Sequence, residues 1–266
     1  MQFWTALQEP FSQAALVVDG HIVKRIPDHP PKTPIRKVDC VAEFDGNLVI
    51  GRRSHLELWK PDGSEMLASL YHPWIFGLHE VQQYKDMFLV ACAGIDCLFL
   101  MDQDGRTKWS WWAHQYGWCP KIEEIESPNW EVMQTTYRTY DFLTKECHLN
   151  SARVFGDEAI ISLMLKEVIL AVPLAGNGSR QLGFGFNSTI HSPIITSTGQ
   201  LAYGRNGGVH LPTGFVGGFD WVKRVYQTSD GSFIFTHEAG VTTITGETIS
   251  GTITLPRPFG IALLEE

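Results

Sequence analysis

Histidines and aspartates recur at one step of a repeated pattern along this chain. Asp39, His79, His148, His191 and Asp220 each stand at the start of a segment that leads into a turn and then into a strongly apolar run. Imidazole is the commonest transition-metal ligand, and three imidazoles on one side of an ion leave its other positions open. If these five positions converge in the folded chain, they form a metal site flanked by two carboxylates.

We therefore predict that His79, His148 and His191 bind one divalent transition metal ion. Three nitrogen ligands suit Fe(II), Cu, Zn or Mn, with Fe(II) as the first choice, whereas Ca²⁺ requires more oxygen ligands. Asp39 and Asp220 are predicted catalytic residues, as a general base, a fourth ligand or an acceptor that orients an imidazole. The competing interpretation is a water-filled channel whose polar side chains bind no metal.

The elements that must position these residues are short β-strands. Long helical periodicity is almost absent, and apolar runs alternate with turns such as Asp45-Gly46 and Asp230-Gly231. The five repeats start at spacings of 40, 69, 43 and 29 residues, scattered around the ~40 to 50 residues of one propeller blade. The innermost strands of a propeller line its channel, so equivalent positions meet there. The shortest spacing predicts that its blade lacks the outermost strand.

The two ends of the chain complement each other. Residues 258–263 resemble an innermost strand with nothing after it, and residues 14–23 resemble a hairpin with nothing before it. Joining them builds one blade from both ends and removes free sheet edges. The sequence thus predicts an all-β, six-bladed β-propeller, a single domain over 1–266; five blades are the alternative if the ends only extend the last repeat.

A segment of about 113–146 interrupts the repeats. It is too polar for a blade and too long for an ordinary loop, and it carries Trp118 and Trp130. We predict an inserted segment that acts either as a lid over the channel mouth, with Trp118 contacting substrate, or as the contact of a homodimer.

Cationic residues are expected to surround the entrance. The second strand of each repeat returns to the face where the first strand begins, which puts Arg52, Arg53, Arg205 and His237 at the rim. Arginine binds carboxylate, sulfate and phosphate groups through two parallel hydrogen bonds. The predicted partner is consequently a small anionic or polar organic substrate.

Composition excludes several other classes. The formal net charge of -8 argues against nucleic acid and anionic membranes as main partners. No window of 18 apolar residues and no signal-peptide pattern occurs, so a cytoplasmic location is expected. The five cysteines contain no CxxC pair; they indicate neither a disulfide framework nor a zinc knuckle, and are expected to be small buried side chains.

Some repeats resemble known propeller families. The segments 148–151 and 191–193, and Asp104-Gly105 followed by Trp109, are similar to the repeats of arylsulfotransferase-like propellers, and 257–262 is similar to an NHL-type inner strand. The first resemblance implies a channel histidine that accepts a sulfuryl group, at His148 or His191. The predicted iron site, with histidine ligands on the propeller axis, is similar in concept to the iron site of the carotenoid-cleaving oxygenases.

These observations lead to one main functional prediction and three alternatives. The main prediction is a metal-dependent enzyme, an oxidoreductase or oxygenase, with its three-histidine site in the channel. The alternatives are a metal-assisted hydrolase or lyase, a non-catalytic propeller that binds a ligand or partner, and sulfuryl or phosphoryl transfer through a histidine.

Overall fold

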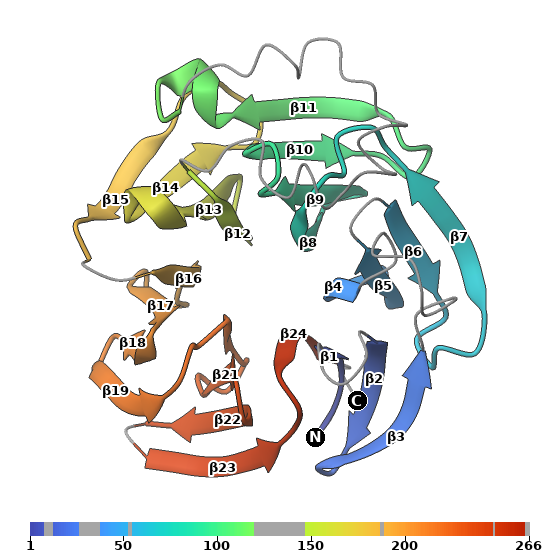
Figure 1. Ribbon diagram of the computed structural model, residues 1–266, viewed down its shortest axis with the longest axis vertical. Helices are drawn as coiled ribbons and strands as arrows, with labels where there is room; N and C mark the ends of the chain where they lie inside the picture. Colours follow the sequence, from blue (N-terminus) through green and yellow to red (C-terminus); the bar gives the residue numbers. More distant parts are fainter. Residues whose placement is uncertain are drawn as a thin grey trace.

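The chain folds into a six-bladed β-propeller, as the repeats predict (Figure 1). In the computed structural model, six four-stranded antiparallel sheets stand around a common axis. The structure describes residues 1–7, 13–26, 38–52, 55–119, 147–186, 189–246 and 248–263. Within these ranges, no helix combines the length and the apolar character that crossing a bilayer requires.

The blades are numbered along the chain, and each has its innermost strand nearest the axis (Figure 1). Blade one contains β24 (Pro258–Leu263), β1 (Gln2–Leu7), β2 (Gln13–Val18) and β3 (His21–Ile26). Blade two contains β4 (Val38–Phe44), β5 (Asn47–Arg52), β6 (His55–Trp59) and β7 (Met66–Tyr71). Blade three contains β8 (Leu78–Tyr84), β9 (Met87–Cys92), β10 (Cys97–Met101) and β11 (Thr107–Trp112), followed by the short 3-10 helix η2 (Ala113–Tyr116).

The remaining blades follow the same order. Blade four contains β12 (Leu149–Phe155), β13 (Glu158–Leu163), β14 (Val168–Pro173) and β15 (Arg180–Phe184), with the 3-10 helix η4 (Met164–Lys166) between β13 and β14. Blade five contains β16 (Ile190–Ile195), β17 (Leu201–Arg205), β18 (Gly207–Leu211) and β19 (Gly214–Phe219). Blade six contains β20 (Arg224–Gln227), β21 (Phe233–His237), β22 (Gly240–Thr245) and β23 (Thr248–Thr254).

Blade one is built from both ends of the chain, as predicted. Strand β24 is its innermost strand and pairs antiparallel with β1, with Phe3 opposite Leu263 and Thr5 opposite Ile261. The Thr5 hydroxyl also donates a hydrogen bond of 2.6 Å to the carbonyl oxygen of Gly260. The pairing of the first and last strands therefore closes the ring and completes the four-stranded sheet of blade one.

Turn chemistry explains why the strands end where they do. At the β4–β5 hairpin, Asp45 and Gly46 both have positive φ, at 47° and 74°. Two consecutive residues with positive φ make the type I′ turn, whose twist matches that of the paired strands, and Asp-Gly is a favoured sequence for it. The turn motifs read from the sequence thus correspond to real hairpins.

Blade five corrects one prediction. The repeat that starts at His191 was expected to lack its outermost strand, yet β19 pairs with β18 along its whole length. The blade fits a short stretch of sequence because its turns are tight and glycine-rich. A Cβ atom on Gly208 would collide with the carbonyl oxygen of Val216, so the close approach of β18 and β19 requires glycine at this position.

The hydrophobic core lies between neighbouring blades. Inner and middle strands are almost wholly buried, whereas the outermost strands β7, β19 and β23 are mostly exposed or only half-buried. Between blades two and three, Phe44 stacks on Phe88 with ring centres 4.1 Å apart. Each blade has two apolar faces to cover, and the ring of six covers both with its neighbours. The rigid inner strands then hold the polar side chains at the axis.

Candidate functional site

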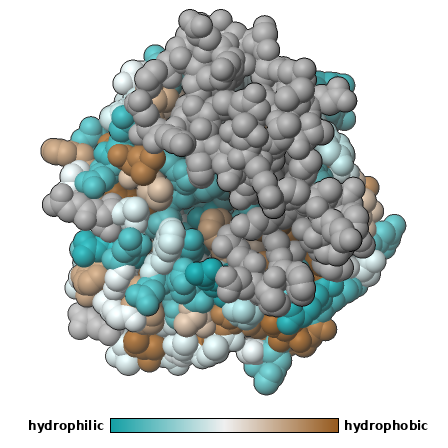
Figure 2. Space-filling model, in the orientation of Figure 1, coloured by the Kyte–Doolittle hydropathy of each residue, from teal (hydrophilic) through white to brown (hydrophobic). Residues whose placement is uncertain are grey.

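One side chain from each blade forms a ring around the axis, which we call the axial ring. Each innermost strand is entered through a buried residue (Val38, Leu78, Leu149, Ile190, Val222 or Pro258), and the next residue belongs to the ring. The ring members are Asp39, His79, Asn150, His191, Lys223 and Phe259. Hydrophilic surface gathers around the middle of the face shown in Figure 2.

In two blades, the member of the axial ring differs from the residue that the alignment of the repeats predicted. In blade four the ring position is Asn150, two residues after His148, because Leu149 opposite Leu163 corresponds to Val38 opposite Arg52. In blade six it is Lys223, three residues after Asp220. His148 and Trp221 have φ of 54° and 47°, so left-handed turns precede these two strands. The alignment of His148 and Asp220 with the other three positions is therefore wrong.

His148 nevertheless lies beside the axial ring and pairs with His79. The two imidazole rings meet edge to face with centres 4.8 Å apart. His79 Nδ1 lies 3.0 Å from the carbonyl oxygen of Gly77, so Nδ1 carries a proton, and in the neutral ring Nε2 holds the lone pair. Burial, and then the nearby charge of Lys223, lower the pKa of His148 to about 4. The pair consequently includes a neutral imidazole at neutral pH.

His191 is held by two other side chains. The indole N–H of Trp221 donates to His191 Nε2 at 2.8 Å, and His191 Nδ1 lies against the side-chain amide of Asn150. Burial, followed by the charges of Lys223, Arg224 and the His148 ring, lowers the pKa of His191 well below its usual range. Because both nitrogens of the neutral His191 ring face protein side chains, this ring is suited to a structural role at the axial ring.

A metal ion bound by all three histidines would require His191 to release either Trp221 or Asn150. Among the described residues, the group whose potential ligand atoms all lie within 4.8 Å of one another is Asp96, Cys119 and Cys147, and it contains none of the three histidines. The three-histidine metal site therefore stays a prediction from the sequence. In the structure, His79 and His148 lie in contact, whereas the two ring nitrogens of His191 contact Trp221 and Asn150.

Cations gather at the same place. Lys223 Nζ lies 3.8 Å from the ring centre of Trp221 and 5.0 Å from that of Phe259. Arg224, almost fully buried below it, has its Nε 3.6 Å from Glu80 Oε1, which also binds an Arg153 nitrogen at 3.0 Å. One carboxylate thus faces two arginines, and Lys223 adds a third cation. With the buried Asp39 of the axial ring included, these groups carry three positive and two negative formal charges, and Lys223 can attract an anionic group.

The two predicted catalytic aspartates have different environments. Asp39 is a buried member of the axial ring in blade two. Asp220 lies just before the turn at Trp221 and is exposed, and its carbonyl oxygen accepts the N–H of Glu238 at 3.2 Å. Their predicted catalytic roles stay predictions.

The predicted rim residues lie at the expected end of their strands but make protein contacts there. Arg205 ends β17 and its guanidinium lies over the Phe215 ring at 4.6 Å. His237 ends β21 and is buried, with Nε2 3.0 Å from Thr242 Oγ1. Arg53 lies outside the described residues. Substrate contacts by these residues stay predictions, and the neighbouring side chains explain why they are not simple surface cations.

Trp118 lies just after η2 and is half-buried. It packs against the hydrophobic cluster between blades three and four, which includes Trp111 and Leu149. The lid and the dimer contact predicted for residues 113–146 fall largely on 120–146, outside the described residues.

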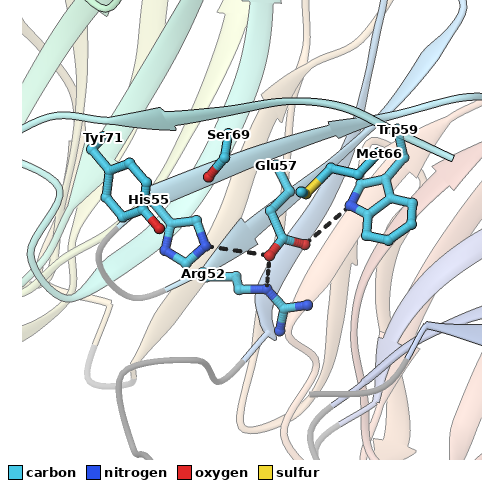
Figure 3. Close-up of a pocket in the computed structure, with 7 residues that line it drawn as sticks. All are labelled: Arg52, His55, Glu57, Trp59, Met66, Ser69 and Tyr71. Atoms are coloured by element: carbon cyan, nitrogen blue, oxygen red, sulfur yellow. Dashed lines mark hydrogen bonds and ion pairs between the residues drawn. The ribbon is translucent and has the colours of Figure 1, made fainter. Parts of the chain in front are cut away.

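Arg52 lines a second hollow, in blade two (Figure 3). The pocket has a volume of about 290 Å³ and is lined by Arg52, His55, Glu57, Trp59, Met66, Ser69 and Tyr71. Glu57 is its centre: Oε1 accepts from Arg52 Nε at 2.6 Å and lies 3.3 Å from His55 Nε2, and Oε2 accepts from Trp59 Nε1 at 3.0 Å (Figure 3). The predicted substrate cation Arg52 is therefore paired inside the blade.

The Glu57 cluster leads to a pH prediction. Burial alone would raise the pKa of the Glu57 carboxyl, but hydrogen bonds from His55 and Arg52, the Arg52 charge and the Trp59 hydrogen bond lower it to about 2. Since this pKa is depressed in the folded state, the carboxylate stabilises the fold fully above about pH 4.5 and loses that contribution as the pH falls toward 2. Glu57→Gln should lower the free energy of unfolding at pH 7 by about 3 kcal/mol.

Urea unfolding across this pH range checks the prediction. The Glu57→Gln protein should show a flatter acid limb than the unmodified protein. Glu65→Gln is the matched control, because Glu65 forms an exposed ion pair with Lys60 and should change stability by less than about 1 kcal/mol. An acid limb unchanged by Glu57→Gln would contradict the assignment.

Comparison with known proteins supports the fold. The folded chain is similar to a protein of unknown function from Bacteroides caccae, with a TM-score of 0.66, 11% identity and 98% of each chain covered. It is also similar to a streptogramin B lyase, with a TM-score of 0.60, 12% identity and coverage of 98% of this chain and 86% of that one. A structure of a nidogen/laminin complex matches with a TM-score of 0.62, 11% identity and coverage of 99% and 98%.

These neighbours are β-propellers, and at such low identity they establish the fold alone. No protein-family profile matches the chain, and no curated protein sequence matches it either. The resemblance found in the sequence is thus confirmed for the propeller architecture.

Sequence reasoning missed Lys223, Arg224 and Trp221. The signal that finds Lys223 is an apolar residue at the start of the innermost strand followed at once by a polar one, a pattern that five blades share and that blade one lacks because Phe259 follows Pro258. Val222-Lys223 has this pattern, as do Val38-Asp39 and Leu78-His79. The histidines and aspartates drew attention away from it.

Proposed function

We propose that this propeller is a lyase that binds a small anionic or polar substrate at the axial ring, with His148 as the general base. The observation that carries the proposal is the neutral His148 imidazole beside His79 and close to the Lys223 cation. The fold shared with a streptogramin B lyase supports this choice over the predicted oxidoreductase. The fold shared with a nidogen/laminin complex makes a non-catalytic binding protein the alternative.

The groups present suit an elimination. His148 removes a proton from a carbon atom of the substrate, and the electrons of that C–H bond form a carbon–carbon double bond. The bond between the adjacent carbon and the leaving oxygen breaks, and the leaving group departs as an anion. Lys223 stabilises the charge that develops on this oxygen. His79 Nε2 accepts a hydrogen bond from the substrate and orients it.

The electrostatics couple substrate charge to the base. Without a bound anion, burial and Lys223 favour the neutral form of His148. An anionic substrate offsets the lysine charge and therefore raises the pKa of His148 toward the range in which a base works best. We expect kcat/KM, which reports the free enzyme, to fall as the pH decreases through about 4. We expect kcat, which reports the enzyme with substrate bound, to fall already at a clearly higher pH. Coincident acid limbs would contradict this coupling.

Lys223 supplies a second prediction. Lys223→Gln removes the cation that faces both the bound anion and the leaving group, so KM should rise by about tenfold or more and kcat should fall by ~100-fold. Lys60→Gln is the control, because Lys60 is exposed in blade two and pairs with Glu65. Steady-state kinetics with both variants separate the two effects, and a change in KM alone would limit Lys223 to binding.

The reaction class is tested with a streptogramin B compound and a panel of esters that carry an acidic C–H next to the carbon bearing the leaving oxygen. Mass spectrometry in ¹⁸O-labelled water distinguishes the outcomes. Elimination incorporates no solvent oxygen, whereas hydrolysis does. A covalent adduct on His148 with a sulfuryl or phosphoryl donor would instead favour group transfer, and no turnover of the panel would favour the binding protein.

A further inference from the structure

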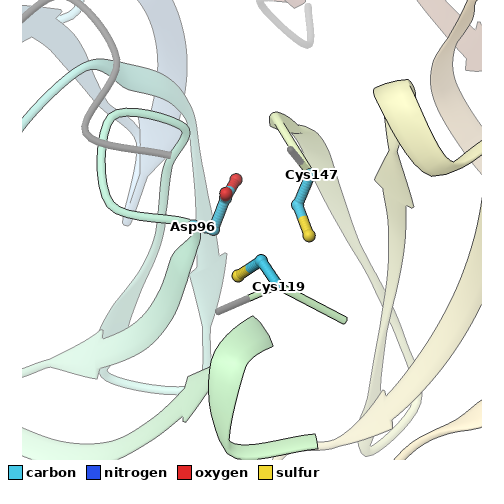
Figure 4. Close-up of side chains that lie close together, drawn as sticks. All are labelled: Asp96, Cys119 and Cys147. Atoms are coloured by element: carbon cyan, nitrogen blue, oxygen red, sulfur yellow. The ribbon is translucent and has the colours of Figure 1, made fainter. Parts of the chain in front are cut away.

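Two cysteines and an aspartate meet between blades three and four, next to the turn that carries His148. Asp96, Cys119 and Cys147 place one carboxylate oxygen and two sulfur atoms within 4.8 Å of one another (Figure 4). Asp96 lies between β9 and β10, Cys119 follows η2, and Cys147 lies two residues before β12. All three side chains are buried. Far-apart parts of the sequence therefore supply donors to one point.

The backbone holds this cluster in place. Asp96 Oδ1 accepts the N–H of Leu149 at 2.7 Å, which ties blade three to blade four. The carbonyl oxygen of Asp96 accepts the N–H of Ala113 at 3.1 Å, and that of Cys147 accepts the N–H of Leu165 at 3.0 Å. Asp96 and Cys147 are thus attached to anchored segments, which lowers the entropy lost when they bind a common ion.

We propose that Asp96, Cys119 and Cys147 form a binding site for Zn²⁺. Thiolate and carboxylate are zinc ligands with bond lengths of about 2.3 Å and 2.0–2.2 Å, so neighbouring ligand atoms of a tetrahedral ion lie roughly 3.5–3.8 Å apart. The observed grouping within 4.8 Å fits this after a small contraction. Three protein donors leave the fourth position for water.

Charge explains why an ion suits this place. A buried carboxylate beside two thiols is costly without a counter-charge. Binding of Zn²⁺ releases one proton from each thiol, so two thiolates and one carboxylate surround a doubly charged cation and the cluster carries a net charge of about -1. A disulfide between the cysteines would remove both thiolate ligands, so the disulfide and the zinc site exclude each other.

Cobalt titration of the reduced, full-length protein tests the site. Co²⁺ should bind with a stoichiometry of one and show the ultraviolet absorption of thiolate-to-cobalt charge transfer, and Zn²⁺ should displace it. Cys119→Ser and Cys147→Ser should abolish this band. Asp96→Asn keeps the oxygen that accepts from Leu149 and should retain the band with affinity lowered about tenfold or more.

Two controls make the result specific. Cys40→Ala removes a buried cysteine that belongs to a different hydrophobic cluster, and His148→Asn removes the imidazole that lies beside the axial ring and follows Cys147 in the chain; both should keep the band. Since a serine variant that does not fold would also lose the band, circular dichroism is recorded for each variant, and native mass spectrometry of the unmodified protein before and after chelation measures the metal independently. Absence of a thiolate band, an unchanged band in folded Cys147→Ser, or a native mass lower by two hydrogens overturns the proposal.

Discussion

His148→Asn should lower kcat of the elimination by about 10²- to 10⁴-fold, the usual contribution of a general base. Asparagine is the appropriate replacement because His148 has a φ of 54°, a left-handed conformation that asparagine tolerates better than most residues. The substitution thus removes the imidazole while it keeps the turn before β12. Steady-state kinetics and the pH profile of the residual activity measure the effect.

Two comparisons show whether this loss is chemical. His21→Ala removes an exposed histidine on the outermost strand β3 and should leave both kcat and stability unchanged. Thermal unfolding of His148→Asn should stay close to that of the unmodified protein, because the ring is only half-buried. If His148→Asn retains full activity while His79→Gln loses it, the base is His79 and the roles within the pair are reversed.

Removal of β24 should abolish cooperative folding. A chain that ends at Pro256 lacks the innermost strand of blade one, including the buried residues Phe259 and Ile261. Ile261 packs in a cluster shared by blades one and six, and Phe259 in one shared by blades one and two. Each is a large buried side chain, and the loss of such a side chain lowers the free energy of unfolding by roughly 2–5 kcal/mol. Together with the lost pairing to β1, this approaches the ~5–15 kcal/mol stability of a typical domain.

Near-ultraviolet circular dichroism and urea unfolding measure the consequence. The truncated chain should lack a cooperative transition, whereas a chain that ends at Leu263 should unfold like the full one. Ile261→Ala is the milder test and should lower the free energy of unfolding by about 2–5 kcal/mol. A truncated chain with an unchanged midpoint would mean that β24 is dispensable for closing the ring.

The supporting contacts of β24 explain why we expect so large an effect. Besides its pairing with β1, the Ile261 N–H donates to the hydroxyl of Tyr226 in blade six at 2.9 Å. One strand at the end of the chain therefore links blade one to blade six through a hydrogen bond and to blade two through packing. Addition of a peptide of residues 257–263 to the truncated chain should restore part of the near-ultraviolet signal.

The architecture was determined by the sequence alone. Local rules suffice for strands and turns, because an apolar run between Asp-Gly pairs can form little except a hairpin strand. The number of blades followed from the spacing of the repeats and from the complementary ends, since an open inner edge at Pro258–Leu263 needs a partner such as Gln2–Leu7. The missing strand wrongly expected in blade five shows the limit of spacing: tight glycine turns fit four strands into fewer residues.

The tertiary structure decided which residues form the axial ring and which form the proposed zinc site. Successive side chains of a strand alternate between faces, so the single left-handed residue at His148 or Trp221 changes which side chain reaches the axis. The turn motifs do not show where that residue occurs, so the alignment of the repeats put His148 and Asp220 at the ring; the ring members Asn150 and Lys223 instead directly follow a buried apolar residue. Cys119 and Cys147 are 28 positions apart with no shared motif. They meet beside Asp96 because blade three packs against blade four, which brings the end of one against the start of the other.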